Sequence, residues 1–127
     1  MVYDNNEFKE FVFRQLKELG ELFKAKNEQY SNGDALANFS TGAALRTGGI
    51  IYGEETAELN KLVLMFEEAK AYQRKHIAFV TNSCVSTPKI EESLKDIAIY
   101  SLIQLYMVEK FKEAAKSLNE RGKQNEL

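Results

Sequence analysis

A run of 12 uncharged residues, from Ile97 to Val108, most constrains how this chain can fold. It reads IAIYSLIQLYMV and follows an acidic start that holds Glu91, Glu92 and Asp96. A helix over this run is apolar nearly all round for about three turns, so one small bundle offers too few neighbours to cover it. We therefore expect a homodimer or tetramer in which this helix packs against another subunit. A central position in a monomer is the alternative.

Apolar residues recur at steps of three and four through most of the chain, and the 127 residues include one proline. The spacing predicts a first helix capped by Asn5 or Asn6, a short helix over 39–45, a long helix over 53–76, and a last helix from Pro88 to Asn119 that Thr87 caps. Residues 77–88 read as a connection that could hold a strand-like piece. The expected fold class is an all-α helical bundle of three long helices and one or more short helices. It forms a single domain over 1–127, with a frayed tail over 120–127, and oligomerisation completes it.

Composition excludes several functional classes. The net charge of −2 provides no basic excess to neutralise the phosphates of a nucleic acid. No run of about 18 apolar residues is free of charge, so we expect no membrane span. The single cysteine, Cys84, cannot form an internal disulfide, and the first residues are acidic and polar rather than signal-like. These features indicate a cytoplasmic protein.

Acidic residues on the inward faces of two predicted helices point to a metal. Glu92 and Asp96 share a helix face with Tyr100, and Glu55 and Glu58 continue an apolar stripe of the preceding long helix. Gathered carboxylates repel each other unless a cation lies among them. Oxygen-only ligands suit Mg²⁺ or Mn²⁺, and such an ion suggests a phosphate substrate. Convergence of the four carboxylates is the test of an enzymatic function.

Several short motifs resemble known families. The segment EETAE, residues 54–58, matches the EExxE motif of the MazG-like all-α nucleoside triphosphate pyrophosphohydrolases, and Glu92 to Asp96 is the nearest equivalent of their ExxD motif. The chain more closely resembles the phage nucleotide modification associated proteins, related to that fold, through KNEQY at 26–30 and EESLKDIAIY at 91–100. This resemblance covers most of residues 26–106. It implies a MazG-like fold and a role in phage or prophage nucleotide metabolism.

The resemblance also implies roles for individual residues. Glu55, Glu58, Glu92 and Asp96 would hold one or two Mg²⁺ ions that polarise a phosphate and help to activate water, so that a nucleoside triphosphate yields a monophosphate and pyrophosphate. Phosphate charge would be neutralised by Lys26, Arg46 and Lys75. Asn27 and Tyr30 would hydrogen-bond the base or sugar, and Phe39 would stack on the base.

Each of these roles has a structural alternative. Acidic residues in a first helical turn are stabilised by the helix dipole, and exposed lysines and arginines are common on any surface. Tyr100 is better explained as a core aromatic whose hydroxyl reaches the rim, and we assign no catalysis to His76 or Cys84. Two functions therefore remain open: a Mg²⁺-dependent nucleotide enzyme or binder, and a non-catalytic helical interaction module or degenerate relative without a metal site. The base, the sugar and any catalytic residue are unknown from the sequence.

Overall fold

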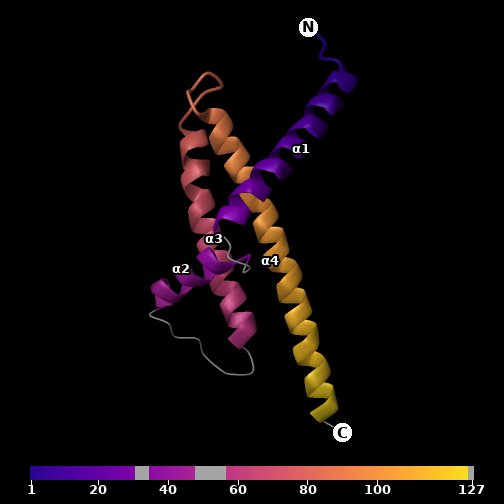
Figure 1. Ribbon diagram of the computed structural model, residues 1–127, viewed down its shortest axis with the longest axis vertical. Helices are drawn as coiled ribbons and strands as arrows, with labels where there is room; N and C mark the ends of the chain where they lie inside the picture. The colour runs from indigo at the N-terminus through magenta and orange to yellow at the C-terminus, as the bar shows by residue number, and fades with distance from the viewer. Residues whose placement is uncertain (31–34, 48–56, 126–127) are drawn as a thin grey trace. The chain divides into compact units, whose positions relative to one another are not determined.

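The structure is a computed structural model that describes residues 1–30, 35–47 and 57–125. Within these ranges the chain forms helices α1 (Asn5–Tyr30), α2 (Ala37–Thr47), α3 (Ala57–Thr81) and α4 (Ile90–Asn125), and no strand (Figure 1). The expected all-α class is confirmed. The chain divides into two compact units, residues 1–35 and residues 36–127, which we describe separately. The expectation of a single domain stays a prediction.

The first unit is built on α1, which begins directly after its cap. The Asp4 carboxylate accepts hydrogen bonds from the backbone N–H groups of Asn6 at 2.7 Å and Glu7 at 3.3 Å. A carboxylate at this position satisfies N–H groups that have no partner inside the helix and also interacts favourably with the helix dipole. Asp4 is therefore the N-cap, and the prediction of Asn5 or Asn6 was wrong.

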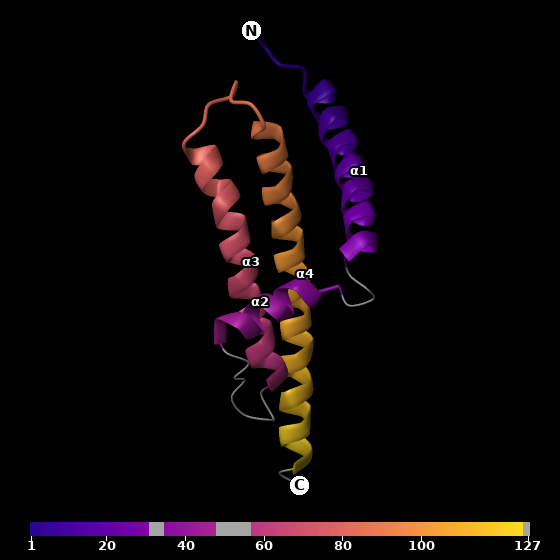
Figure 2. The same cartoon turned by 60° about the vertical axis from the view of Figure 1, so that its left-hand side comes forward.

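In the second unit, α3 and α4 lie side by side and run antiparallel, joined by the short turn after Thr81 (Figures 1 and 2). A short connection favours this arrangement, because the chain must return along the helix it has just left. A small apolar core lies where α2, α3 and α4 meet. Its buried members are Phe39, Ala43, Leu62, Met65, Ala69 and Met107.

Helix α2 packs against α3 at a glycine. A Cβ atom on Gly42 would lie 2.8 Å from the side chain of Glu68, whose exposed fraction is only 8%. Any larger residue at position 42 would therefore require the Glu68 side chain to move. The contact brings Phe39, one turn earlier in α2, towards the aromatic residues of α3 and α4.

The helix bounds differ from prediction around the α3–α4 turn. Helix α3 continues to Thr81, where the hydroxyl donates to the carbonyl of Ile77 at 2.8 Å, so the strand-like connection from residue 77 was wrong. Thr87 does not cap α4, because the helix begins three residues later, and the Thr87 hydroxyl instead accepts from the backbone N–H of Cys84 at 2.9 Å. Lys89 then adopts a φ of 67°, outside the helical region, and α4 begins at Ile90.

No helix in the part of the chain that the structure describes has the length and apolar character needed to cross a membrane.

Candidate functional site

Four rings and a carboxylate meet where α2, α3 and α4 converge. Tyr100 of α4 lies with its ring centroid 6.4 Å from Phe39 of α2 and 6.3 Å from Tyr72 of α3. Phe39 and Tyr72 are 5.9 Å apart, and the imidazole of His76 stacks on Tyr100 at 6.0 Å and 27°. Aromatic pairs at these separations attract each other beyond their simple burial. We call Phe39, Tyr72, His76, Asp96 and Tyr100 the Tyr100 cluster.

The polar edge of the Tyr100 cluster is a pair formed across the two long helices. Nε2 of His76 lies 3.7 Å from Oδ2 of Asp96, and each side chain is 30% exposed. This separation is too long for a direct hydrogen bond but close enough for attraction when the imidazole is protonated. Both groups keep access to solvent, so the pair can contact a ligand.

The phenol of Tyr100 is held neutral by its surroundings. Partial burial raises the pKa of Tyr100 above its ordinary value, and the nearby Asp96 carboxylate and Tyr72 raise it further. Each effect disfavours the phenolate, because a buried or negatively charged environment opposes a new negative charge. Tyr100 is therefore a hydroxyl donor throughout the neutral pH range.

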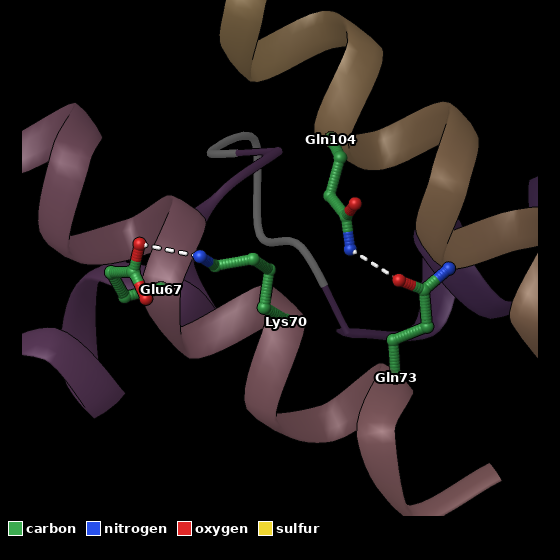
Figure 3. Close-up of polar contacts among 4 residues, drawn as sticks. All are labelled: Glu67, Lys70, Gln73 and Gln104. Atoms are coloured by element: carbon green, nitrogen blue, oxygen red, sulfur yellow. Dashed lines mark hydrogen bonds and ion pairs between the residues drawn. The ribbon is translucent and has the colours of Figure 1, made fainter. Parts of the chain in front are cut away.

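The buried side chain of Gln73 links α3 to α4 next to the Tyr100 cluster. Gln73 of α3 donates from Nε2 to the carbonyl of Ile97 at 2.9 Å and to the hydroxyl of Ser101 at 2.8 Å. Its Oε1 accepts from Gln104 at 2.9 Å (Figure 3). The exposed pair of Glu67 and Lys70, also drawn in Figure 3, stays within α3. The glutamines thus fix the register that keeps His76 opposite Asp96.

The structure does not bring the predicted metal ligands together. Glu58 lies in the first turn of α3 and Glu92 in the first turn of α4, and both are exposed. His76 lies beside Asp96, so it marks the position of Asp96 along α3. Glu58 lies about five turns before His76 on the same helix, which is roughly 27 Å at about 1.5 Å per residue. Glu55 lies outside the described residues. The three described carboxylates therefore do not fit one shared metal ion.

Among the described residues, no three or more His, Cys, Asp or Glu side chains lie together in a group that could hold a metal. Glu92 and Asp96 are four residues apart on α4 and can approach the same ligand, but they form a pair rather than a cage. The predicted Mg²⁺ or Mn²⁺ site stays a prediction, and we derive no reaction step through it.

The predicted substrate-binding residues are dispersed over three helices. Lys26 and Asn27 lie on α1, in the first unit. Lys75 is exposed on α3, three residues after Tyr72 and so beside it on the helix surface. Tyr30 and Arg46 are the other two, and their side chains lie outside what the structure describes.

Sequence reasoning missed two members of the Tyr100 cluster. Tyr72 was interpreted only as part of the apolar stripe, and His76 only as a residue at a helix end. The signal was present in the spacing, since Tyr72 and His76 are four residues apart on α3, as Asp96 and Tyr100 are on α4. When two antiparallel helices pack side by side, two such pairs come into contact if they lie at the same height along the helix axes.

Apart from the Tyr100 cluster, α3 and α4 form a hollow lined by apolar side chains. It encloses about 170 Å³ and is lined by Leu62, Val63, Phe66, Met107, Val108 and Phe111. Without polar groups to orient a substrate, this hollow offers packing volume rather than chemistry.

Comparison of the chain with the models of known protein families, with curated proteins and with solved structures found no significant match.

Proposed function

We propose that this protein binds a nucleoside triphosphate at the Tyr100 cluster, as a MazG-like member of phage or prophage nucleotide metabolism. The observation that carries the proposal is the contact of His76 with both Asp96 and Tyr100. Asp96 and Tyr100 are the two ends of DIAIY, the segment on which the resemblance to the phage nucleotide modification associated proteins rests. Their meeting with a solvent-accessible imidazole supports a ligand site built on that segment.

The chemistry of the Tyr100 cluster suits a nucleotide. Aromatic faces stack on any base, with little preference for its identity. The Asp96 carboxylate can accept a hydrogen bond from a sugar hydroxyl or a base amine, and the neutral Tyr100 phenol can donate one. The exposed cations Arg74 and Lys75 precede His76 on α3, where they can attract phosphate charge.

The proposed activity is binding rather than hydrolysis. The described carboxylates that were expected to hold Mg²⁺ lie too far apart to share an ion, and hydrolysis in the families that the chain resembles relies on such an ion. A magnesium ion would therefore arrive with the triphosphate, which binds it through its own oxygens. Release of pyrophosphate stays an expectation from the resemblance.

Two further properties belong to this proposal. We place the protein in the cytoplasm, where nucleoside triphosphates are present, and we infer that it assembles with copies of itself. The second inference rests on α4, in which the uncharged run from 97 to 108 includes leucines that are more than half exposed.

Calorimetry tests the nucleotide site. A mixed pool of ribo- and deoxyribonucleoside triphosphates is titrated into wild type, Asp96→Asn and Glu58→Gln, with and without Mg²⁺. Binding that Asp96→Asn abolishes and Glu58→Gln preserves supports the Tyr100 cluster. Loss of binding in Glu58→Gln would instead support the predicted four-carboxylate site. No binding by folded wild-type protein would leave the non-catalytic helical interaction module as the function.

A further inference from the structure

Helix α4 carries apolar residues on two of its sides: Met107 and Ile103 pack in the core against α3, and leucines lie on the side away from α3. Its polar Ser101 and Gln104 turn towards α3, where both bond to Gln73. On the opposite side, Leu102 is 57% exposed and Leu105 is 63% exposed. A helix whose leucines point away from its only described neighbours needs another surface to cover them.

These leucines belong to a continuous stripe along α4. Leu94, Ala98, Leu102 and Leu105 follow each other at steps of four, four and three, which place them on one helix face. Leu94 is 49% exposed, and Ala98, between Leu94 and Leu102, is partly buried. We call these four residues the outer stripe. Charged side chains flank it, with Lys95 near its start and Glu109 just beyond its end.

We propose that the outer stripe binds the outer stripe of a second copy of this chain, with the two α4 helices antiparallel about a two-fold axis near Leu102. An isologous contact suits this surface, because an uncharged apolar stripe is complementary to itself. The small side chain of Ala98 allows the helices to approach closely beside Leu102.

The direction of the pairing follows from charge. Lys95 and Glu109 are each seven residues from Leu102, on opposite sides of it. An antiparallel pair therefore places Lys95 of each copy opposite Glu109 of the other, which gives two attractive contacts. A parallel pair would place Lys95 against Lys95 and Glu109 against Glu109. Like charges in contact disfavour that alternative.

The remaining charges near the stripe are compatible with the antiparallel arrangement. About the same axis Glu91 comes opposite Glu113, with Lys112 beside it and Lys116 about one turn further on. Within its own chain, Glu113 already pairs with Lys110 at 3.1 Å. The net charge that faces Glu91 is therefore positive.

This inference rests on the self-association proposed above and does not depend on nucleotide binding. Its first test measures the mass of the full chain by light scattering across a concentration series, without nucleotide. Wild type should dimerise or form a multiple of the dimer, and Leu102→Asp should be monomeric because two aspartates would meet at the axis. Leu45→Asp is the matched control, because Leu45 is 80% exposed on α2, away from the stripe. Circular dichroism confirms that each variant is helical.

The second test is a charge exchange that only the antiparallel arrangement predicts. Lys95→Glu should weaken self-association roughly tenfold by placing two glutamates at each contact, and Glu109→Lys should do the same with two lysines. The double variant Lys95→Glu/Glu109→Lys should recover the wild-type affinity. A mixture of the two single variants should form the heterodimer in preference to either homodimer, as native mass spectrometry can resolve.

The outcomes separate the possible failures. A wild-type chain that is monomeric at every concentration overturns self-association itself, whatever the calorimetry of nucleotides shows. A dimer that Leu102→Asp does not dissociate overturns the outer stripe as its interface. A dimer lost in Leu102→Asp but unaffected by either charge reversal, or stabilised by both, overturns the antiparallel pairing.

Discussion

Gln104 of α4 donates its side-chain amide to Oε1 of Gln73 on α3 at 2.9 Å, across the interface of the two longest helices of the second unit (Figure 3). Gln73 in turn donates to the Ile97 carbonyl and the Ser101 hydroxyl, and no more than 9% of its surface is exposed. A buried amide with this many partners permits one register, since a shift of either helix would leave several polar atoms without partners. That register is what brings His76 opposite Asp96.

Gln73→Ala should lower the free energy of unfolding by about 2–3 kcal/mol, because it removes three hydrogen bonds and leaves the Gln104 amide without its acceptor. The measurement is urea denaturation followed by circular dichroism. The exposed Asn119→Ala, also on a helix of this unit, is the control and should change stability by less than about 0.5 kcal/mol.

A double-mutant cycle isolates the pair of glutamines. Gln73→Ala, Gln104→Ala and the double variant should yield a coupling free energy of about 0.5–3 kcal/mol. Strict additivity of the two single effects would show that the glutamines do not contact each other in solution, and the register would then need revision.

The pKa of Tyr100 provides a prediction that depends on pH. Burial and the Asp96 carboxylate hold this pKa above its ordinary value, so the folded chain keeps the phenolic proton when the unfolded chain has lost it. The contribution of Tyr100 to folding is therefore intact below about pH 10 and declines as the pH rises above that value.

Ultraviolet titration of the tyrosines checks the shift. Tyr100→Phe should remove a tyrosine that ionises at high pH, and Asp96→Asn should lower the pKa of Tyr100 because it removes the nearby negative charge. Tyr3→Phe, which changes an exposed tyrosine before α1, is the control and should leave the pKa of Tyr100 unchanged. A tyrosine spectrum that Asp96→Asn leaves unchanged would contradict the proximity of the two groups.

Much of the fold could be predicted from the sequence, because helix periodicity is a local property. The apolar steps of three and four located all four helices, including the short one, now Ala37–Thr47. The ends were less predictable. Helix α3 runs to Thr81, whose hydroxyl donates back to the carbonyl of Ile77, a contact that propensity alone does not reveal.

The arrangement of the site was harder to predict than its residues. Glu58 and Glu92 both stand at helix starts, and successive helices in an antiparallel hairpin begin at opposite ends. Acidic residues that look equivalent in sequence are thus separated in space. The contact of His76 with Asp96 depends instead on the exact register of α3 and α4, which the buried glutamines set.

Gly42→Ala tests the close packing of α2 on α3. The added methyl group would lie 2.8 Å from the Glu68 side chain, which must move within a tightly packed contact. We expect a loss of about 1–3 kcal/mol in the free energy of unfolding. Gly20→Ala and Gly122→Ala are matched controls, since no atom lies within 4 Å of the new methyl group in either helix.

Both control substitutions should leave stability unchanged or raise it by up to about 1 kcal/mol, because alanine favours the helix over glycine. The measurement is the urea midpoint of each variant at constant denaturation slope. If Gly42→Ala behaves like its controls, α2 does not approach Glu68 as closely as described.

The exposed thiol of Cys84 should react as an unusually acidic cysteine. Its pKa is lowered from 9.0 to about 7, chiefly by the Ser86 hydroxyl, which lies 3.2 Å from Sγ, and next by Thr87. Since the folded pKa is the lower one, thiolate formation favours the folded state above about pH 7, and this contribution is lost as the pH falls through that value. Alkylation by iodoacetamide should thus have its midpoint near pH 7 in the folded protein and near pH 9 in urea.

At pH 7 the folded chain should react roughly five- to tenfold faster than the unfolded chain, since its larger thiolate fraction outweighs the weaker nucleophilicity of a more acidic thiol. Ser86→Ala should move the midpoint of the folded protein upwards, because the thiolate loses its nearest hydroxyl donor. Ser83→Ala is the matched control: the Ser83 hydroxyl bonds to the Phe79 carbonyl instead, so the midpoint should stay near pH 7. A folded protein whose alkylation profile coincides with that in urea would show that the turn between α3 and α4 does not hold these hydroxyls against Cys84.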